Sequence, residues 1–213
     1  MFKLRAFLSH ILHASMSIQP TRNIAIFASG AGTNAANIIE YFKQKNTTNI
    51  VLIISNNPQA GVLKIADTND IPSLIIQKEK FFKGDAYVPE LKNAGVDFIV
   101  LAGFLWKVPS LIITAFRDNI INIHPALLPK YGGKGMYGNF VHEAVLAAKE
   151  KESGITIHFV DEFYDNGKTI FQTACPVYEN DTTESLAKRI HELEYKYFPK
   201  VIEELIEKSN KKQ

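Results

Sequence analysis

Short runs of apolar residues alternate along the first part of the chain with stretches in which apolar residues recur at helical spacing. The apolar runs predict five buried strands, at residues 24–28, 49–55, 72–77, 96–103 and 119–124. The stretches between them predict four helices, at residues 35–45, 61–70, 84–94 and 109–118. Strands that alternate with helices in this way are typical of a mostly parallel, Rossmann-like sheet with helices on both faces. We therefore predict a single-domain α/β fold.

The pattern changes after residue 125. Four glycines fall within residues 131–138, which indicates a loop that we expect to be mobile. The following residues predict a helix and two more exposed strands, at residues 139–152, 154–162 and 168–178. The DNG sequence at residues 165–167 is expected to form the tight turn between these two strands.

A long helical region is predicted near the end of the chain, over residues 182–208. Thr182 or Thr183 is suited to cap its N terminus, because a hydroxyl can accept a hydrogen bond from an N–H group of the first turn. Pro199 has no N–H to donate in a helix interior, so we expect it to kink or divide the helix.

Two polar residues leave the fifth predicted strand together. Asn122 and His124 point to the same side of this strand, because side chains alternate between the two faces. Pro125 then ends the strand. In open α/β sheets the ligand crevice lies at such strand ends, so this pair is a candidate for chemistry.

Composition excludes several classes of function. The chain has 213 residues, of which 46% are hydrophobic, and its formal net charge is +2. Residues 1–22 hold three basic residues and no acidic ones, so the formal net charge of the remaining residues is about −1. We therefore expect no nucleic-acid-binding face, and no apolar run approaches the ~18 residues of a membrane helix. The single Cys175 fits a reducing compartment and is read as a small hydrophobic residue.

The N-terminal segment is basic and amphipathic. A targeting peptide and an early start codon both fit residues 1–22, and Met16 opens a stretch that leads naturally into the first strand. We expect this segment to be an unstructured extension and residues 23–208 to form the domain.

The glycine-rich sequence SGAGTN follows the first predicted strand and opens the first predicted helix. Residues 30–35 match G-x-G-x-x-A, but residues 55–57 offer no acid to hold a ribose, so a nicotinamide cofactor fits poorly. A turn without a ligand is a second alternative. A monophosphate fits better, held by the N–H groups at a helix N terminus, here those of Gly32, Thr33 and Asn34.

The remaining polar candidates are weaker when taken singly. Asp165 is an ordinary residue for a turn, and His158 in a strand is more often structural than functional. His142 and His191 fall within helices and are read as packing or surface residues. No pair of Cys or His residues has the spacing of a zinc site, so we expect no metal.

Five motifs, taken in order, resemble the glycinamide ribonucleotide formyltransferase family of purine biosynthesis. They are SGAGTN, LAGFLW, NIHPALLPKYGGKG, GITIHFVDEFYDNG and LEYKYFP, and the resemblance covers residues 23–205. It implies transfer of a formyl group from 10-formyltetrahydrofolate to the glycinamide amine of a ribosyl phosphate. It also implies that Asn122 and protonated His124 stabilise the oxyanion, and that Asp165 raises the pKa of His124.

The resemblance implies further contacts. The phosphate would bind at Gly32, Thr33 and Asn34, and Glu194 would bind the ribose hydroxyls. The folate would meet Asn122 and the segment that consists of Leu105, Trp106, Lys107 and Val108. Thr156 matches a hydroxyl-bearing position beside the active site. Trp106 stands where many relatives have Arg, so the basic contact to the folate tail is open, with Lys83 as a candidate.

Two other functions remain open at this stage. A nicotinamide-dependent oxidoreductase would use residues 30–35 and should respond to NAD or NADP. A non-catalytic nucleotide-binding module would bind ribosyl phosphate but leave Asn122, His124 and Asp165 without a purpose. We expect a cytoplasmic enzyme with small-molecule substrates, no nucleic-acid or membrane partner, and a monomeric or weakly dimeric state.

Overall fold

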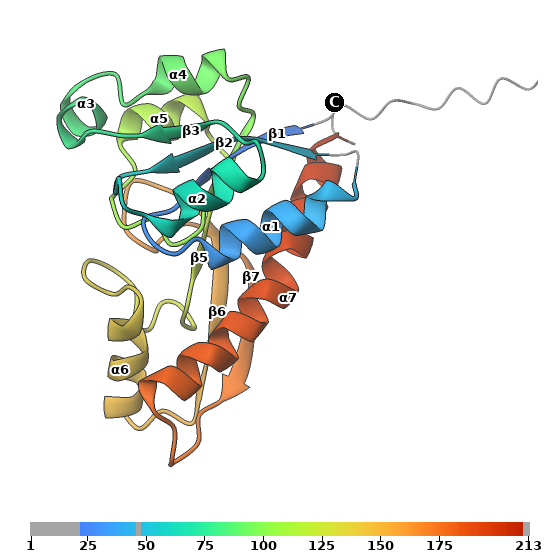
Figure 1. Ribbon diagram of the computed structural model, residues 1–213. Helices are drawn as coiled ribbons and strands as arrows, with labels where there is room; N and C mark the ends of the chain where they lie inside the picture. The colour runs from blue at the N-terminus through green and yellow to red at the C-terminus, as the bar shows by residue number, and fades with distance from the viewer. Residues whose placement is uncertain (1–21, 46–47, 211–213) are drawn as a thin grey trace, which may run out of the picture.

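The computed structural model describes residues 22–45 and 48–210 (Figure 1). Within these residues, seven strands form one sheet in the spatial order β3-β2-β1-β4-β5-β6-β7. The strands are β1 (Arg22–Phe27), β2 (Thr48–Ser55), β3 (Ser73–Ile75), β4 (Phe98–Leu101), β5 (Ile120–His124), β6 (Glu152–Phe159) and β7 (Thr169–Pro176). β1 to β5 pair in parallel, whereas β6 is antiparallel to both β5 and β7. The predicted mostly parallel α/β sheet is confirmed.

Helices cover both faces of the sheet (Figure 1). They are α1 (Thr33–Lys43), α2 (Gly61–Thr68), α3 (Lys78–Lys83), α4 (Val88–Asn93), α5 (Ser110–Ala115), α6 (Asn139–Ala147) and α7 (Thr183–Asn210). Alternate residues of β1 belong to two separate cores. Ile24 and Ile26 pack with α1, α2 and α7, whereas Ala25 and Phe27 pack with α3, α4 and α5. This alternation is what the period of two along a strand requires.

The long C-terminal helix α7 is continuous. It runs through Pro199 as one helix, so of the two effects expected of this proline, division of the helix does not occur. Phe198 and Ile202, on either side of the proline, are fully buried in the core that α7 shares with α1. Burial of apolar side chains can offset the loss of one backbone hydrogen bond in a helix.

The expected cap of α7 is present. Ser185 N–H donates to Thr182 Oγ1 at 3.2 Å, and Thr182 N–H donates to Ser185 Oγ at 2.9 Å. This reciprocal pair satisfies two N–H groups at the helix start, so Thr182 is the capping residue.

The helix predicted at 84–94 begins later than expected, because only α4, at Val88–Asn93, lies in this range, and the short helix α3 that precedes it was not predicted. Ala86 and Tyr87 separate them and both have positive φ, at 54° and 60°. Ala86 is fully buried and the hydroxyl of Tyr87 accepts a hydrogen bond from the backbone N–H of Gln77 at 2.8 Å. Tertiary contacts therefore hold a backbone conformation that the local pattern does not favour.

The tight turn predicted at 165–167 is also wrong. β6 ends at Phe159 and β7 begins at Thr169, so residues 160–168 form a longer loop. A Cβ atom on Gly167 would lie 1.7 Å from the carbonyl oxygen of Phe159, so glycine is required at this close approach. The loop carries Asp165, at φ 51°, toward the end of β5.

The predictions for residues 1–21, including the one at Met16, lie outside the described residues. Arg22 is the first residue of β1, so it does not belong to an unstructured extension. In residues 22–45 and 48–210, no helix combines the length and the apolar character needed to cross a membrane.

Candidate active site

The candidate site lies where β5 ends against β6. Asn122 is paired with His158 and His124 with Thr156 across the antiparallel ladder. Ile121 and Ile123 point into the core beneath α1 and α7, so Asn122 and His124 face the opposite side, as predicted. His124 is buried with 4% of its surface exposed.

The carboxylate of Asp165 is the common neighbour of the polar residues in this site. Its Oδ2 accepts a hydrogen bond from Gly133 N–H at 2.9 Å. Its Oδ1 lies 3.4 Å from Nδ2 of Asn122 and 3.6 Å from Nδ1 of His124. The structure thus brings together all three residues predicted to be catalytic, although 41 residues of sequence separate His124 from Asp165.

His158, which was expected more often to be structural than functional, lies in the same cluster. Its Nδ1 donates to the carbonyl oxygen of Phe159 at 2.8 Å, which leaves Nε2 as an acceptor for Asn122 Nδ2 at 3.1 Å. Nε2 also lies 3.7 Å from Oδ1 of Asp165. The pairing of β5 with β6 explains its position, because the antiparallel register places His158 directly opposite Asn122. Only a prediction of this register from the sequence would have placed His158 in the site.

Both N–H hydrogens of the Asn122 amide therefore have partners within the site. One is directed at His158 and the other at Asp165. Asn122 can donate to a developing oxyanion only when one of these two hydrogen bonds gives way.

His124 is held between a carbonyl and a carboxylate. Its Nε2 donates to the carbonyl oxygen of Tyr131 at 2.7 Å, and its Nδ1 faces Asp165. Burial lowers the pKa of His124, and although Asp165 and the Tyr131 carbonyl raise it, the net direction is below the ordinary value. This direction runs against the expected protonated form of His124, which stays a prediction, because burial outweighs the carboxylate that was expected to keep the ring charged.

Asp165 is ionised more readily than an ordinary carboxyl group. Burial opposes its charge, but the contacts that Asp165 makes with His158, His124 and the Gly133 N–H outweigh burial and hold the pKa of Asp165 below its usual range. The surroundings therefore favour the ionised form of Asp165 and the neutral form of His124.

The glycine loop forms a second part of the site. Gly32 precedes α1 with φ 80°, a left-handed conformation that favours glycine. In the described part of the chain, no acceptor is found for the backbone N–H groups of Gly32, Thr33 and Asn34. These groups remain available to an anion at the N terminus of α1.

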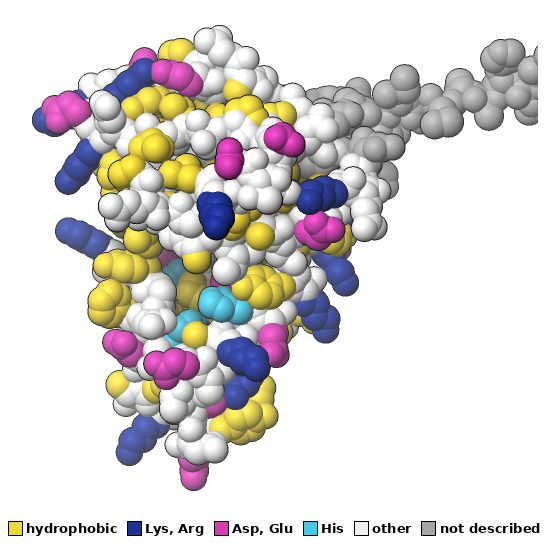
Figure 2. Space-filling model, in the orientation of Figure 1, with side chains coloured by type: hydrophobic (Ala, Val, Ile, Leu, Met, Phe, Trp, Pro, Cys, Tyr) yellow, Lys and Arg dark blue, Asp and Glu magenta, His cyan; other side chains and the backbone are white. Residues whose placement is uncertain are grey.

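Glu194 of α7 lies beside this loop. Its Oε2 accepts a hydrogen bond from Nδ2 of Asn34 at 2.8 Å, and burial raises its pKa to about 7. His191, half exposed, lies 4.0 Å from the same oxygen, and His142 is buried, so both match their expected packing and surface roles. Figure 2 shows histidine side chains gathered in a hollow between α1 above and the lower part of α7.

The segment after β4 borders the site on its other side. A narrow pocket of about 60 Å³ is lined by Trp106, Lys107 and Val108 together with Asn122, His158 and Asp165, among others. Leu105 N–H donates to Ser29 Oγ at 2.9 Å, so that backbone donor is already used. The proposed folate segment and the polar cluster thus share one pocket.

Aromatic residues of α3 support this segment and were not predicted to lie near the site. The ring of Trp106 lies 5.6 Å from Phe81 and 5.5 Å from Phe82. Lys83, the candidate basic contact, is exposed and donates to Glu79 of its own helix at 2.9 Å. It is not among the residues that line the pocket.

Two kinds of site were not expected from the sequence, namely a metal site and a site for the ribose of a dinucleotide. Across the described ranges, no group of three or more His, Cys, Asp or Glu residues could hold a metal ion. At the end of β2, Asn56 accepts a hydrogen bond from Ser29 Oγ at 2.6 Å, and Asn57 donates to the Ser29 carbonyl at 3.4 Å. Neither residue supplies the acid that a dinucleotide ribose needs.

Thr156 holds the chain that follows His124. Its hydroxyl donates to the carbonyl oxygen of Ala126 at 2.6 Å and accepts from the N–H of Leu128 at 3.0 Å. Nε2 of Gln172 donates to the same hydroxyl at 2.8 Å. Thr156 therefore positions the loop that carries Tyr131, rather than facing the site with a free hydroxyl.

Comparison with known proteins places this geometry in a family. Residues 22–202 match the formyl transferase family model. The chain is 42% identical over 193 residues to the chloroplastic phosphoribosylglycinamide formyltransferase of Arabidopsis thaliana, covering 87% of this chain and 66% of that protein. The phosphoribosylglycinamide formyltransferase of Bacillus subtilis is 34% identical, with 89% of this chain and 97% of that protein covered.

Solved structures agree with the sequence comparisons. The phosphoribosylglycinamide formyltransferase of Bacillus halodurans has a TM-score of 0.80 at 35% identity, covering 88% of this chain and 97% of that one. The enzyme of Anaplasma phagocytophilum has a TM-score of 0.79 at 34% identity, with 87% of each chain covered. The chain spans slightly less than two thirds of the length of the plant relatives that it matches.

Proposed function

Because the chain belongs to the formyl transferase family, we propose that it transfers a formyl group from 10-formyltetrahydrofolate to the glycinamide amine of 5-phosphoribosylglycinamide. The observation that carries the proposal is the convergence of Asn122, His124 and Asp165 beside the pocket that Phe104 and residues 106–108 help to line. The names of the relatives from Arabidopsis thaliana and Bacillus subtilis supply the substrate.

The two substrates would approach the polar cluster from different sides. The free N–H groups of the glycine loop can donate hydrogen bonds to the phosphate. The buried carboxyl group of Glu194 can accept hydrogen bonds from the ribose hydroxyls. The pocket between Trp106 and Asp165 lies on the side proposed for the folate ring, but its volume of about 60 Å³ is small for a ligand site, so the ring would have to widen it on binding. His124 and Asn122 lie between these two regions.

The reaction needs one new bond and two proton movements. The amine nitrogen attacks the formyl carbon, the carbonyl oxygen becomes negative, and the bond from this carbon to the folate nitrogen breaks. The amine loses a proton and the leaving nitrogen gains one, so atoms and charge balance. A neutral His124 can accept the first proton and deliver the second, directly or through a water molecule.

Asp165 would act on His124 at the moment when the imidazole becomes charged. Its carboxylate favours the imidazolium, which offsets part of the cost of charging a buried ring. The positive ring and the Asn122 amide can then both donate hydrogen bonds toward the oxyanion, provided that Asn122 releases His158 or Asp165 and that one ring nitrogen of His124 turns away from the Tyr131 carbonyl or from Asp165.

No step of this scheme calls for a metal ion, and the formyl-folate acts as a co-substrate. The cytoplasmic location and the monomeric or weakly dimeric state stay predictions from the sequence, as does the domain boundary at residue 208.

Turnover with the two substrates tests the proposal. Purified protein is incubated with 5-phosphoribosylglycinamide and 10-formyltetrahydrofolate, and mass spectrometry follows the gain of one formyl group on the amine. We expect catalytic turnover that requires both substrates. Absence of formylated product, or a stability shift with NAD or NADP but none with the folate, would contradict the proposal.

A further inference from the structure

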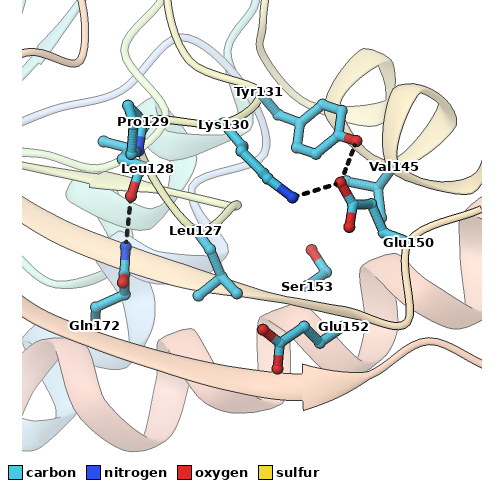
Figure 3. Close-up of a pocket in the computed structure, with 10 residues that line it drawn as sticks. All are labelled: Leu127, Leu128, Pro129, Lys130, Tyr131, Val145, Glu150, Glu152, Ser153 and Gln172. Carbon is cyan, nitrogen blue, oxygen red and sulfur yellow. Dashed lines mark hydrogen bonds and ion pairs between the residues drawn. The ribbon is translucent and has the colours of Figure 1, made fainter. Parts of the chain in front are cut away.

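A second pocket lies behind the loop that follows His124 (Figure 3). Its volume is about 300 Å³, and it shares no lining residue with the pocket at Asn122. The loop segment 127–131 forms one wall, and Val145 of α6, the start of β6 and Gln172 of β7 form the others. The proposed function assigns no role to this pocket.

The pocket carries one unbalanced negative charge. Glu150 Oε1 accepts hydrogen bonds from Lys130 Nζ and from the Tyr131 hydroxyl, each at 2.9 Å, so this carboxylate is already paired. Glu152 also lines the pocket; it is exposed and, among the described residues, forms no hydrogen bond or ion pair, although it attracts the ammonium group of Lys130 electrostatically. The two carboxylates and the one ammonium leave a net charge of −1, which suits a ligand with a single positive charge.

A buried hydroxyl provides a second and independent sign of a ligand. Ser153 is 2% exposed, and within the described ranges its Oγ has no hydrogen-bond partner. Figure 3 shows this hydroxyl directed into the space below Lys130 and Glu150. Buried polar groups are almost always hydrogen-bonded, so an unpaired hydroxyl that lines a pocket marks a place for a partner.

Aliphatic side chains form another part of the lining. Leu127, Pro129 and Val145 present them to the pocket, beside the polar side chain of Gln172. Polar groups that converge beside an aliphatic wall are typical of sites for small organic molecules. The volume also lies at the lower end of the range for such sites.

We propose that this pocket is a binding site for a small organic monocation, an alkylammonium or alkylguanidinium. The cationic head would donate hydrogen bonds to Glu152 and to Ser153 Oγ, and its aliphatic body would lie against Leu127 and Val145. An inorganic metal ion does not fit, because no group of three suitable ligands exists in the described chain. An anion would be repelled by the net negative charge of the pocket.

The pocket is connected to the active site through Tyr131. The hydroxyl of this residue is bound to Glu150 at the pocket, and its carbonyl oxygen accepts the hydrogen bond from His124 Nε2. A bound cation would therefore lie against the residue that holds the catalytic imidazole.

Binding of n-hexylammonium to the full chain tests the inference, with 1-hexanol and hexanoate as neutral and anionic ligands of matched length. Amide chemical shifts are followed by NMR during titration. We expect saturable shifts in residues 127–131 and 150–153 with hexylammonium, and at least about tenfold weaker binding of the alcohol and the acid anion. Equal binding of all three, or shifts that map elsewhere, would overturn the proposal.

Two substitutions locate the cation in the pocket. Glu152→Gln removes the unpaired charge, and Ser153→Ala removes the hydroxyl; Glu207→Gln removes one charge from an exposed position on α7 as the control. We expect about tenfold weaker hexylammonium binding in Glu152→Gln, a smaller loss in Ser153→Ala, and no change in Glu207→Gln. Equal affinity in Glu152→Gln and the control would overturn the proposal.

Discussion

At the scale of single residues, the site depends on the environment of two ionisable side chains. His124 is buried beside the carboxylate of Asp165. Burial lowers the pKa of His124 by more than Asp165 raises it, so the pKa is below its ordinary value. The alternation along β5 predicted that Asn122 and His124 face one side, but sequence patterns do not report how deeply a side chain is buried. For this reason the position of His124 was predictable and its charge was not.

Replacement of Asp165 by Asn should slow formyl transfer without unfolding the protein. We expect turnover to fall by about 10²–10⁴-fold, the range for a positioned acid–base contribution. The pKa of His124 should fall further, because the carboxylate that favours the imidazolium is lost. Steady-state kinetics and NMR titration of His124 measure the two effects.

Glu162→Gln is the matched control for that substitution, because Glu162 is an exposed acid in the same loop. It should leave both turnover and the His124 titration unchanged. An unaltered His124 pKa in Asp165→Asn would show that the carboxylate does not act on the imidazole.

Glu194 should make the protein less stable as the pH rises. Its folded-state pKa is about 7 against an ordinary value of 4.5, because burial disfavours the carboxylate. The folded state therefore binds this proton more tightly than the unfolded state between these two values. The free energy of unfolding should decrease by roughly 3 kcal/mol from this group as the pH rises from about 4.5 to about 7.

Glu194→Gln tests this directly, since glutamine can still accept the hydrogen bond from Asn34 but carries no charge. We expect the variant to be more stable than the original protein above pH 7 and similar to it near pH 4. Urea unfolding at the two pH values measures the difference. The same stability difference at both would show that the buried carboxylate does not titrate in this range.

At the scale of elements, the parallel strands were predictable and the connections were less so. Buried strands such as β1 and β4 are continuous apolar runs, which a sequence shows plainly. The helix pair α3 and α4 and the loop 160–168 depend instead on contacts between distant residues. Gly167, for example, is required by the carbonyl of Phe159, a constraint that no local pattern records.

Substitution of two glycines in the loop before α1 should affect stability to different extents. A Cβ atom on Gly32 would lie 2.7 Å from Cβ of Val62, and φ is +80°, whereas Gly30 has nothing within 4 Å. We expect Gly32→Ala to lower the free energy of unfolding by about 2–4 kcal/mol. Gly30→Ala should change it by less than about 1 kcal/mol.

Urea unfolding of both variants measures the contrast. Equal losses in the free energy of unfolding would show that the packing of Gly32 against α2 does not cause the destabilisation. A larger residue at Gly32 would therefore strain the fold in addition to any effect on an anion bound at this loop.

The hydroxyl of Thr156 should matter for activity through the loop that it holds. Thr156→Val keeps the shape but removes hydrogen bonds to Ala126 and Leu128. We expect a loss of about 1–3 kcal/mol in the free energy of unfolding and slower turnover, because Tyr131 would be held less firmly against His124. Thr169→Val, at an exposed position on β7, is the control and should affect neither.

At the scale of the whole molecule, the sheet topology assembles the site. β5 and β6 are antiparallel neighbours, and the loop after β6 returns Asp165 to the end of β5. The strand pattern predicted the place of Asn122 and His124, whereas Asp165 was singled out by resemblance to the family and His158 was read as structural. Long-range pairing in the sheet decides both of these positions.

The measurement that tests the central claim most directly is the rate of formyl transfer in a double-mutant cycle of His124→Ala and Asp165→Asn. If Asp165 acts through His124, the double variant should be as slow as His124→Ala alone, because both changes remove one proton-transfer function. Losses that multiply, so that the double variant is slower by the product of the two single effects, would contradict the account.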